Sequence, residues 1–143
     1  MKVGLANFLL DTNAVSEWVK PQPNPGLLDW MDATDEDRIF LSVVSLAELR
    51  YGVERLAEGK RRRRLEEWLE EELPLRFEGR VLPVDPSIAD SWGRTVCRYE
   101  AAGRPMGVID AFLAATAETH QMTLVTRNVS DFALLKMVLN PWN

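Results

Sequence analysis

The 143-residue sequence contains one cysteine and one histidine. A single cysteine, Cys97, excludes an internal disulfide framework and a cysteine-rich zinc module, and it suits a reducing compartment. Its position in a predicted helix indicates an inert packing role. The only histidine, His120, follows another predicted helix, which favours a helix-end or surface position over a catalytic base.

Long apolar runs and an excess of positive charge are also missing. The N-terminal apolar stretch Phe8–Leu10 stops at Asp11, so it is too short for the core of a signal peptide or for a membrane span. Seventeen basic residues against 22 acidic ones give a net charge of −5, which argues against a protein that coats nucleic acid with its whole surface. The sequence predicts a cytoplasmic protein that does not bind membranes, and a local basic patch remains open.

The overall composition is that of an ordinary globular domain. Apolar residues make up 46% of the chain and charged residues 27%, which argues against disordered, collagen-like and low-complexity proteins. The length suits one domain with its own core, and no internal repeat is visible. Residues 1–143 are therefore predicted to form a single domain.

Short apolar runs alternate with segments of helical periodicity. The runs predict strands at Leu5–Leu10, Ile39–Ser42, Arg80–Val84, Thr123–Thr126 and Met137–Leu139. Helices are predicted at Ala14–Val19, from near Pro25 through Met31, and at Val43–Ala57, Lys60–Glu72, Pro86–Ala102, Val108–Thr119 and Phe132–Leu135. Such alternation implies right-handed crossovers. The expected fold class is α/β: a three-layer α/β/α sandwich with a central, mostly parallel sheet of four to five strands.

Acidic and amide side chains follow or face the ends of these strands. Asp11 follows the first strand, Glu48 lies on the helix after the second, Asp110 opens the helix before the fourth, and Asn128 and Asp131 follow the fourth. In such sheets ligands bind beyond the carboxyl ends of the strands. Carboxylates gathered there repel one another unless a cation neutralises them, and oxygen ligands favour Mg²⁺ or Mn²⁺. The sequence predicts a metal site that activates a water for attack on a phosphoryl group.

Each of these residues also has a purely structural interpretation. Asp11 could cap the helix that follows it, and Glu48 could be an ordinary surface glutamate. Asp110 could favour the helix dipole, Asn128 could adopt a turn conformation, and Asp131 could cap a helix beginning at the next residue. The case for a site rests on the set rather than on any one residue.

Four ordered stretches of the chain resemble the PIN-domain family, in particular the VapC- and FitB-type toxins of toxin–antitoxin pairs. They are Leu9–Glu17, Leu41–Gly52, Gly107–Ala117 and Leu124–Phe132, and Asn140–Trp142 resembles the FitB-type ending. Together they span nearly the whole chain, and four motifs in order are far more specific than one Asp-x-Asn. The resemblance implies an α/β/α nuclease that dimerises and cuts single-stranded RNA with Mg²⁺ or Mn²⁺, leaving 5′-phosphate and 3′-hydroxyl ends.

The same resemblance implies roles for individual residues. Asp11, Glu48 and Asp110 match the acidic ligands of the family. The fourth acid varies in position, and Asn128 stands where some FitB-like members carry it, so an amide replaces a charge and Asp131 could compensate through water. Asn13 and Thr126 match polar positions that would orient a phosphate or water.

The resemblance further implies partners. These are an RNA substrate, a second copy of the chain and a cognate antitoxin, which could bind DNA within a hetero-oligomer of both proteins. Basic candidates for RNA contact are Lys60–Arg64, Arg50, Arg94, Arg98 and Arg104, although the glutamates that follow Arg64 also suit a solvated helix. Val15, Trp18, Leu49, Val53 and Leu56 could line an antitoxin groove or belong to the core.

Two other interpretations stay open. A PIN-like fold without activity would serve as a binding module, which the retained acids oppose and Asn128 slightly favours. A phosphate-accepting receiver domain also gathers acids at strand ends. It would need paired acids after the first strand and a late lysine, whereas this chain has Asp11-Thr12 and no lysine between Thr123 and Asp131.

Overall fold

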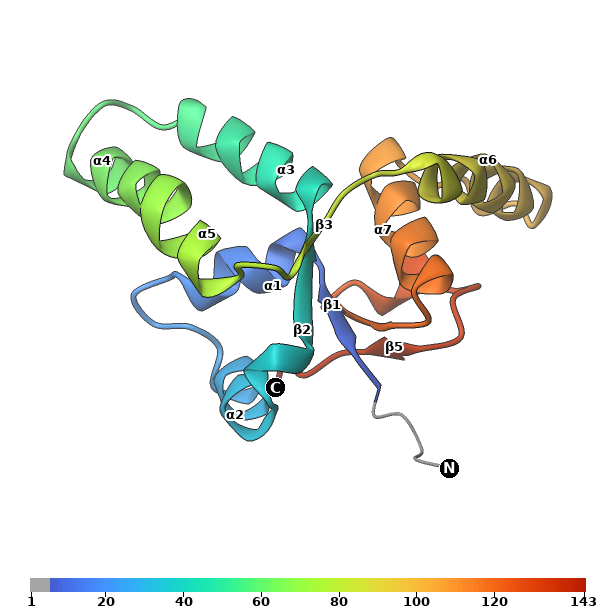
Figure 1. Cartoon of the computed structure of the whole chain (residues 1–143), viewed down its shortest axis with the longest axis horizontal. Coiled ribbons are helices and arrows are strands. Elements are labelled where there is room, and N and C mark those ends of the chain that lie inside the picture. The colour runs from blue at the N-terminus through green and yellow to red at the C-terminus, as the bar shows by residue number, and fades with distance from the viewer. Residues whose placement is uncertain (1–5) are drawn as a thin grey trace.

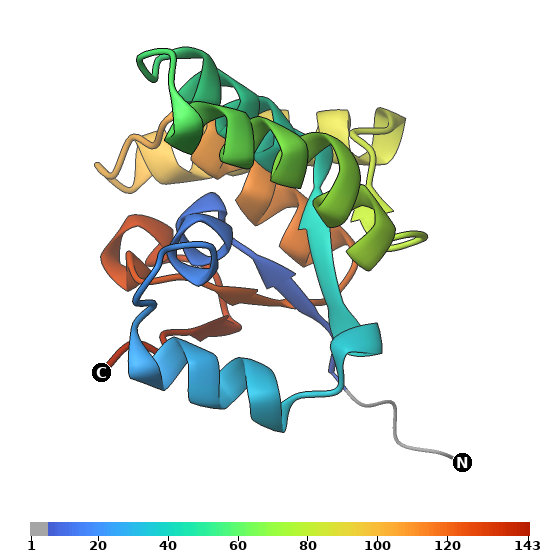
Figure 2. The ribbon, with the colours of Figure 1, turned by 90° about the vertical axis from the view of Figure 1, so that its left-hand side faces the viewer.

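The computed structural model describes residues 6–143 and consists of a five-stranded sheet flanked by helices (Figures 1 and 2). The strands are β1 (Phe8–Leu10), β2 (Ile39–Ser42), β3 (Val81–Leu82), β4 (Thr123–Val125) and β5 (Val138–Leu139). They lie in the order β3-β2-β1-β4-β5, and every pair is parallel. The predicted three-layer sandwich around a parallel sheet is confirmed.

The helices begin and end close to where the periodicity predicts. They are α1 (Thr12–Trp18), α2 (Pro25–Ala33), α3 (Val43–Glu54), α4 (Lys60–Glu67), α5 (Leu73–Arg76), α6 (Pro86–Ala101) and α7 (Val108–Thr119), with 3-10 helices η1 (Glu36–Arg38) and η3 (Val129–Phe132) and the π-helix η2 (Trp68–Glu72). Asp85 caps α6 because its side chain accepts a hydrogen bond from the Ile88 amide at 3.0 Å. No helix within residues 6–143 is long and apolar enough to cross a membrane.

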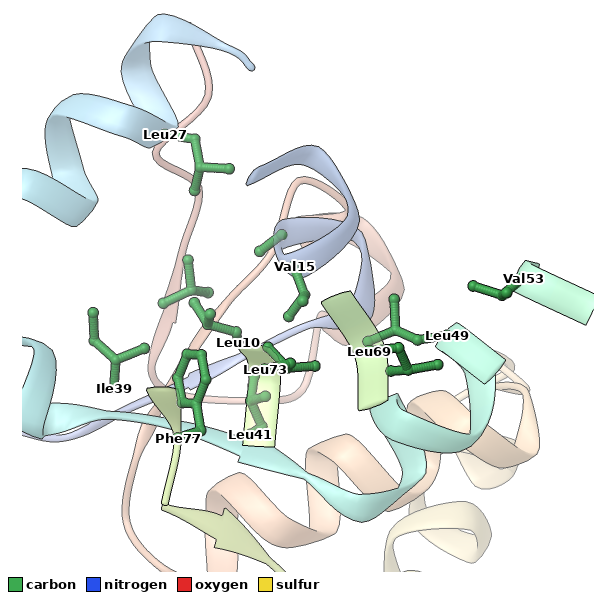
Figure 3. Close-up of a cluster of buried hydrophobic side chains, with 12 residues drawn as sticks. Leu10, Val15, Leu27, Ile39, Leu41, Leu49, Val53, Leu69, Leu73 and Phe77 are labelled. Carbon is green, nitrogen blue, oxygen red and sulfur yellow. The ribbon is translucent and has the colours of Figure 1, made fainter. Parts of the chain in front are cut away.

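Alternating strand residues divide the core into two layers. Leu10, Leu41 and Val125 point to the side covered by α1, α2, α3 and α5, where Phe77 is fully buried (Figure 3). Leu9 and Leu124 point to the opposite side and pack against α7. Figure 1 shows α3, α4 and α5 on one side of the strands and α6 and α7 on the other. Each strand is therefore apolar on both faces, as the sequence indicates.

Two predicted boundaries are wrong in detail, and a third lies outside the described residues. The helix from Lys60 does not end at Glu72 but continues through η2 into α5, because Leu73 and Phe77 are buried anchors beyond that point. Pro74, which has no N–H, lies where the wide π-turn changes to α5. The third strand is shortened to Val81–Leu82, where Pro83 follows it. Leu5, the predicted start of the first strand, lies outside the described residues.

The turn after β4 also differs from the prediction. A helix was predicted at Phe132–Leu135, but η3 covers Val129–Phe132 and begins after Asn128. The cause is local: the Asn128 amide donates to the Thr126 hydroxyl at 3.0 Å, which starts the turn directly after the strand. Asp131 consequently lies inside η3, and the structural interpretation of Asp131 as a helix cap is wrong.

Candidate active site

The carboxyl ends of β1, β2 and β4 lie side by side because these strands are adjacent and parallel. Asp11 follows β1, Thr126 follows β4, and β2 leads directly into α3, which carries Glu48. Asp110 stands in the first turn of α7, and Asp131 lies in η3 after β4. Four carboxylates that are far apart in the sequence are thus brought to one edge of the sheet.

Asp11 is held in a buried position by a neighbouring strand end. Its side chain is 4% exposed, and Oδ2 accepts a hydrogen bond from the Thr126 hydroxyl at 2.7 Å. Burial raises the pKa of the Asp11 carboxyl above its ordinary value, while the Thr126 hydrogen bond opposes this rise. Asp11 occupies the N-cap position of α1, and the backbone N–H groups of Thr12 and Asn13 also oppose the rise of its pKa. Its hydrogen bond to Thr126, 115 positions away, goes beyond the role of a local helix cap.

Glu48 is fixed by a hydroxyl from α1. The Thr12 hydroxyl donates to Oε1 of Glu48, and Thr12 Oγ1 also lies 2.9 Å from the Oγ of buried Ser45. This contact joins α1 to α3 and directs the Glu48 carboxylate toward the residue that follows Asp11. Glu48 is half-buried, so the interpretation as a freely solvated surface glutamate is wrong.

The pKa of Asp110 is affected by the negative charges of all three other acids of the set. Its pKa is raised to about 6, first by burial and then by the negative charges of Asp11, Asp131 and Glu48. Asp110 and the exposed Asp131 also line one cavity of about 390 Å³. A carboxyl that feels three other carboxylates is the electrostatic sign of a site that attracts a cation.

The two predicted asparagines, Asn13 and Asn128, are exposed, unlike Asp11 and Glu48. Asn128 is exposed at the N-cap of η3, where its backbone amide bonds to Thr126 and its side chain caps nothing. Asn13 is exposed on α1, and over residues 6–143 its side chain forms no hydrogen bond. Over the described range, neither side-chain amide forms a hydrogen bond with a carboxylate of the set.

The acids share an electrostatic field without forming a closed ligand cage. Within the described range, no three Asp, Glu, His or Cys side chains lie close enough together to hold one ion. Asp11 is occupied with Thr126, and Glu48 with Thr12. This geometry still fits Mg²⁺, which keeps several waters and is usually bound through only one or two carboxylates. The donor set, entirely oxygen, suits Mg²⁺ or Mn²⁺ rather than zinc.

Thr12 was not predicted from the sequence to belong to the site. It stands between Asp11 and Asn13 in the first quoted motif, but its partner Glu48 is 36 positions away. The available signal was the pair of small polar residues, Thr12 and Ser45, on two elements that both lead from adjacent strands. A hydroxyl between helices would then be expected to hold a carboxylate.

Replacing Thr126 by valine is expected to loosen the site. Valine keeps the shape but leaves both the Asp11 carboxylate and the Asn128 amide without the hydroxyl that they share. Each lost partner of a buried polar group costs about 1–3 kcal/mol, so we expect the free energy of unfolding to fall by about 2 kcal/mol or more, measured by urea denaturation.

Thr116→Val is the matched control for this prediction. Thr116 is equally buried, but its hydroxyl donates only to the Phe112 carbonyl within α7 at 2.7 Å. That carbonyl is also bonded by the helix backbone, so the loss should stay below about 1 kcal/mol. Equal losses in the two variants would mean that Thr126 has no special part in holding Asp11.

The chain is similar to known proteins in both sequence and fold. The PIN domain family matches residues 8–135. The toxin FitB of Neisseria gonorrhoeae is 38% identical over 137 residues, which cover 95% of this chain and 99% of FitB. The VapC ribonuclease Y4jK of Sinorhizobium fredii is 36% identical over 136 residues, covering 94% of this chain and 97% of Y4jK.

Solved structures are similar over the same length. The crystal structure of FitAcB from Neisseria gonorrhoeae superposes with a TM-score of 0.88 and 36% identity, covering 95% of this chain and 99% of that one. VapBC-5 of Mycobacterium tuberculosis superposes with a TM-score of 0.69 and 27% identity, covering 95% and 99%. With a family match over most of its length and relatives of this identity, the chain belongs to the PIN-domain family.

Proposed function

We propose that this protein is a Mg²⁺- or Mn²⁺-dependent endoribonuclease and the toxin of a toxin–antitoxin pair, acting in the cytoplasm on single-stranded RNA. The observation that carries the proposal is the meeting of four carboxylates, from four separate elements, at the carboxyl edge of the sheet of a PIN domain. The names of the relatives, a FitB toxin and a VapC ribonuclease, support the same activity.

The proposed role of each acid depends on how deeply it is buried and on what holds it. Asp11, buried and fixed by Thr126, provides a negative charge whose position does not change. Glu48, held by Thr12, provides a second from α3, and Asp110 a third from α7. Asp131, exposed at the rim, can reach the site through a water, and Asn128 offers only a carbonyl oxygen.

A bound Mg²⁺ or Mn²⁺ would stabilise negative charge on a phosphoryl oxygen and lower the pKa of a water for attack. The chain holds this chemistry in place with Asp11, Glu48 and Asp110, while Asp131 and Asn128 are the candidates to complete the set. His120 lies at the opposite end of α7 from Asp110, and Cys97 is exposed on α6. The acids therefore act by orienting charge and water rather than through a covalent nucleophile.

The partner is proposed to be an antitoxin that covers the groove beside Glu48. This groove, of about 720 Å³, is formed by α1, α3 and α4, and Leu49, Val53, Leu56, Leu65 and Trp68 line it. An amphipathic segment with apolar anchors fits such a surface. Solved structures of relatives include FitAB bound to a DNA fragment and VapBC from Salmonella typhimurium bound to DNA. We expect a toxin–antitoxin hetero-oligomer in which the antitoxin contacts DNA.

The groove also sorts the five apolar candidates from the sequence. Leu49, Val53 and Leu56 line it, whereas Val15 is completely buried in the core. Trp18 lies beside a separate cavity with Trp68 and packs edge-on against Phe77 at 6.1 Å between ring centroids.

The test is incubation of the purified protein with a panel of single-stranded RNAs and matched DNAs. We expect RNA cleavage in Mg²⁺ or Mn²⁺, loss of cleavage with a chelator, and recovery when the ion is restored. The same samples distinguish the alternative of an inactive binding module, which would bind the ion or the partner but leave every RNA intact at all ion concentrations.

A further inference from the structure

The negative charge of this site repels the phosphates of an RNA substrate. The inference that follows from this rests on the proposed function. The protein carries a net charge of −5, and the four acids add a local concentration of negative charge. The backbone of RNA is itself negative, so a strand needs positive side chains close to the acids to bind. The structure decides which of the many arginines are available for this.

Four of the basic candidates already pair with acidic side chains. Arg50 contacts Glu54 and Glu70, Arg62 bridges Glu54 and Glu66, Arg94 pairs with Asp90, and Arg98 pairs with Glu118. These contacts hold helices together or lie along α6. They account for four of the arginines that the sequence offered as RNA contacts.

Of the other candidates, three exposed arginines line the two pockets that contain acids of the set. Arg104 lines the cavity that contains Asp110 and Asp131, whereas Arg61 and Arg64 line the groove that contains Thr12 and Glu48. In the part of the chain that the structure describes, none of the three forms an ion pair. The acid set is thus bordered by free positive charge in both of the hollows that it lines.

The backbone fixes where Arg104 stands. Gly103 adopts a φ of +72°, the left-handed conformation that favours glycine at the end of a helix. The Arg104 amide donates to the Tyr99 carbonyl at 2.9 Å, and the Gly103 amide donates to the Glu100 carbonyl at 3.0 Å. The backbone of Gly103 and Arg104 is therefore held by hydrogen bonds to the last turn of α6.

We propose that a single strand of RNA crosses the acids between Arg104 on one side and Arg61 with Arg64 on the other. Arg61 and Arg64 belong to α4, and Arg104 precedes α7; these helices lie on opposite sides of the strands (Figure 1). The phosphates on the two sides of the cleaved bond would contact the arginines, leaving the phosphate between them at the carboxylates. Arginine suits this role because its planar guanidinium binds phosphate oxygens in pairs.

The RNA strand and the antitoxin proposed above would compete for this groove, whose lining favours an unpaired strand over a duplex. Leu65 and Trp68 lie beside Arg61 and Arg64 in the groove. Bases that are not paired can pack against apolar and aromatic side chains, whereas bases inside a helix cannot. Arg61, Arg64 and Arg104 are accordingly positioning residues, which act on binding rather than on bond cleavage.

The experiment measures binding of a short fluorescent single-stranded RNA to the full chain by anisotropy at several salt concentrations. Asp11→Asn serves as the background, so that the RNA stays intact. Arg104→Gln and the double variant Arg61→Gln/Arg64→Gln are compared with Arg94→Gln and Arg94→Gln/Arg98→Gln, which remove the same charge from α6. Arg104→Lys keeps the charge, and thermal melting of each variant reports its folding.

We expect Arg104→Gln to weaken RNA binding about threefold to tenfold at low salt and to lower the salt dependence by about 0.7 in the log–log slope. The double variant should lose about twice that slope. Arg104→Lys should recover most of the affinity, and in the active protein Arg104→Gln should raise KM with little change in kcat. The α6 control variants should bind RNA nearly as the background does.

Equal affinities and slopes for the Arg104 and Arg94 variants would overturn this proposal, even if the wild type cleaves RNA. Loss of binding to the antitoxin with unchanged RNA binding would likewise overturn it and assign these arginines to the protein partner. If the wild type cleaves no RNA in either ion but the expected differences in RNA binding are found, the proposed ribonuclease activity is contradicted. The role of the three arginines in RNA binding is then supported without it.

Discussion

Asp11→Asn is expected to lower RNA cleavage at least about 100-fold in saturating Mg²⁺ or Mn²⁺. The amide has nearly the same shape, and its oxygen can still accept the hydrogen bond from Thr126, so the position of the side chain is kept. What disappears is the buried negative charge closest to the strand end. Single-turnover cleavage of labelled RNA, with melting of the same samples, measures the effect.

Asp90→Asn is the control for this substitution. Asp90 is exposed on α6, and among the described residues its one ion pair is with Arg94, at 3.1 Å, so its loss should leave cleavage unchanged. If Asp11→Asn, Asp90→Asn and the wild type all cut RNA at one rate, the activity belongs to a contaminating nuclease and Asp11 is not catalytic.

Asp110→Asn is expected to have opposite effects on stability in the absence and presence of the ion. Without metal, the carboxylate is disfavoured by burial and by three like charges, so the variant should be more stable than the wild type at pH 7 by about 1–2 kcal/mol. With Mg²⁺ or Mn²⁺, the wild type should gain stability by binding the ion and the variant should gain far less. Cleavage should fall with Asp110 as it does with Asp11.

The pH dependence of this difference follows from the sign of the shift. The folded pKa of Asp110 is raised from 3.8 to about 6, so between these values the folded state holds a proton that the unfolded state has lost. The metal-free wild type should therefore lose stability relative to Asp110→Asn as pH rises from about 4 to about 6, and the difference should stay constant above that. Chemical denaturation in chelator at several pH values tests it. A constant difference over this range would contradict the electrostatic account.

Much of the site follows from the position of each residue after a strand. Asp11 was recognisable because an apolar run ends at it, and the parallel sheet then brings Thr126 to within hydrogen-bond distance. Glu48 was marked by its place on the helix after β2. The fold class was predictable because the strands are apolar on both faces and β1, β2 and β3 are each followed by an α-helix.

Other features depend on contacts that no local pattern records. Thr12 reaches Glu48 across 36 positions, and the π-turn before Pro74 depends on the burial of Leu73 and Phe77. The shift of η3 toward Asn128 results from a hydroxyl two residues earlier. The division of the arginines into paired and free ones is likewise a property of helix packing, not of the basic run at Lys60–Arg64.

The most direct test of the central claim is a crystal structure of the protein soaked with Mn²⁺, with data collected at a wavelength where manganese scatters anomalously. We expect an anomalous peak among Asp11, Glu48, Asp110 and Asp131, with at least one carboxylate oxygen at about 2.1 Å and waters completing the shell. An RNA-cleaving protein whose manganese peak lies elsewhere, with the four acids free of metal, would contradict the account.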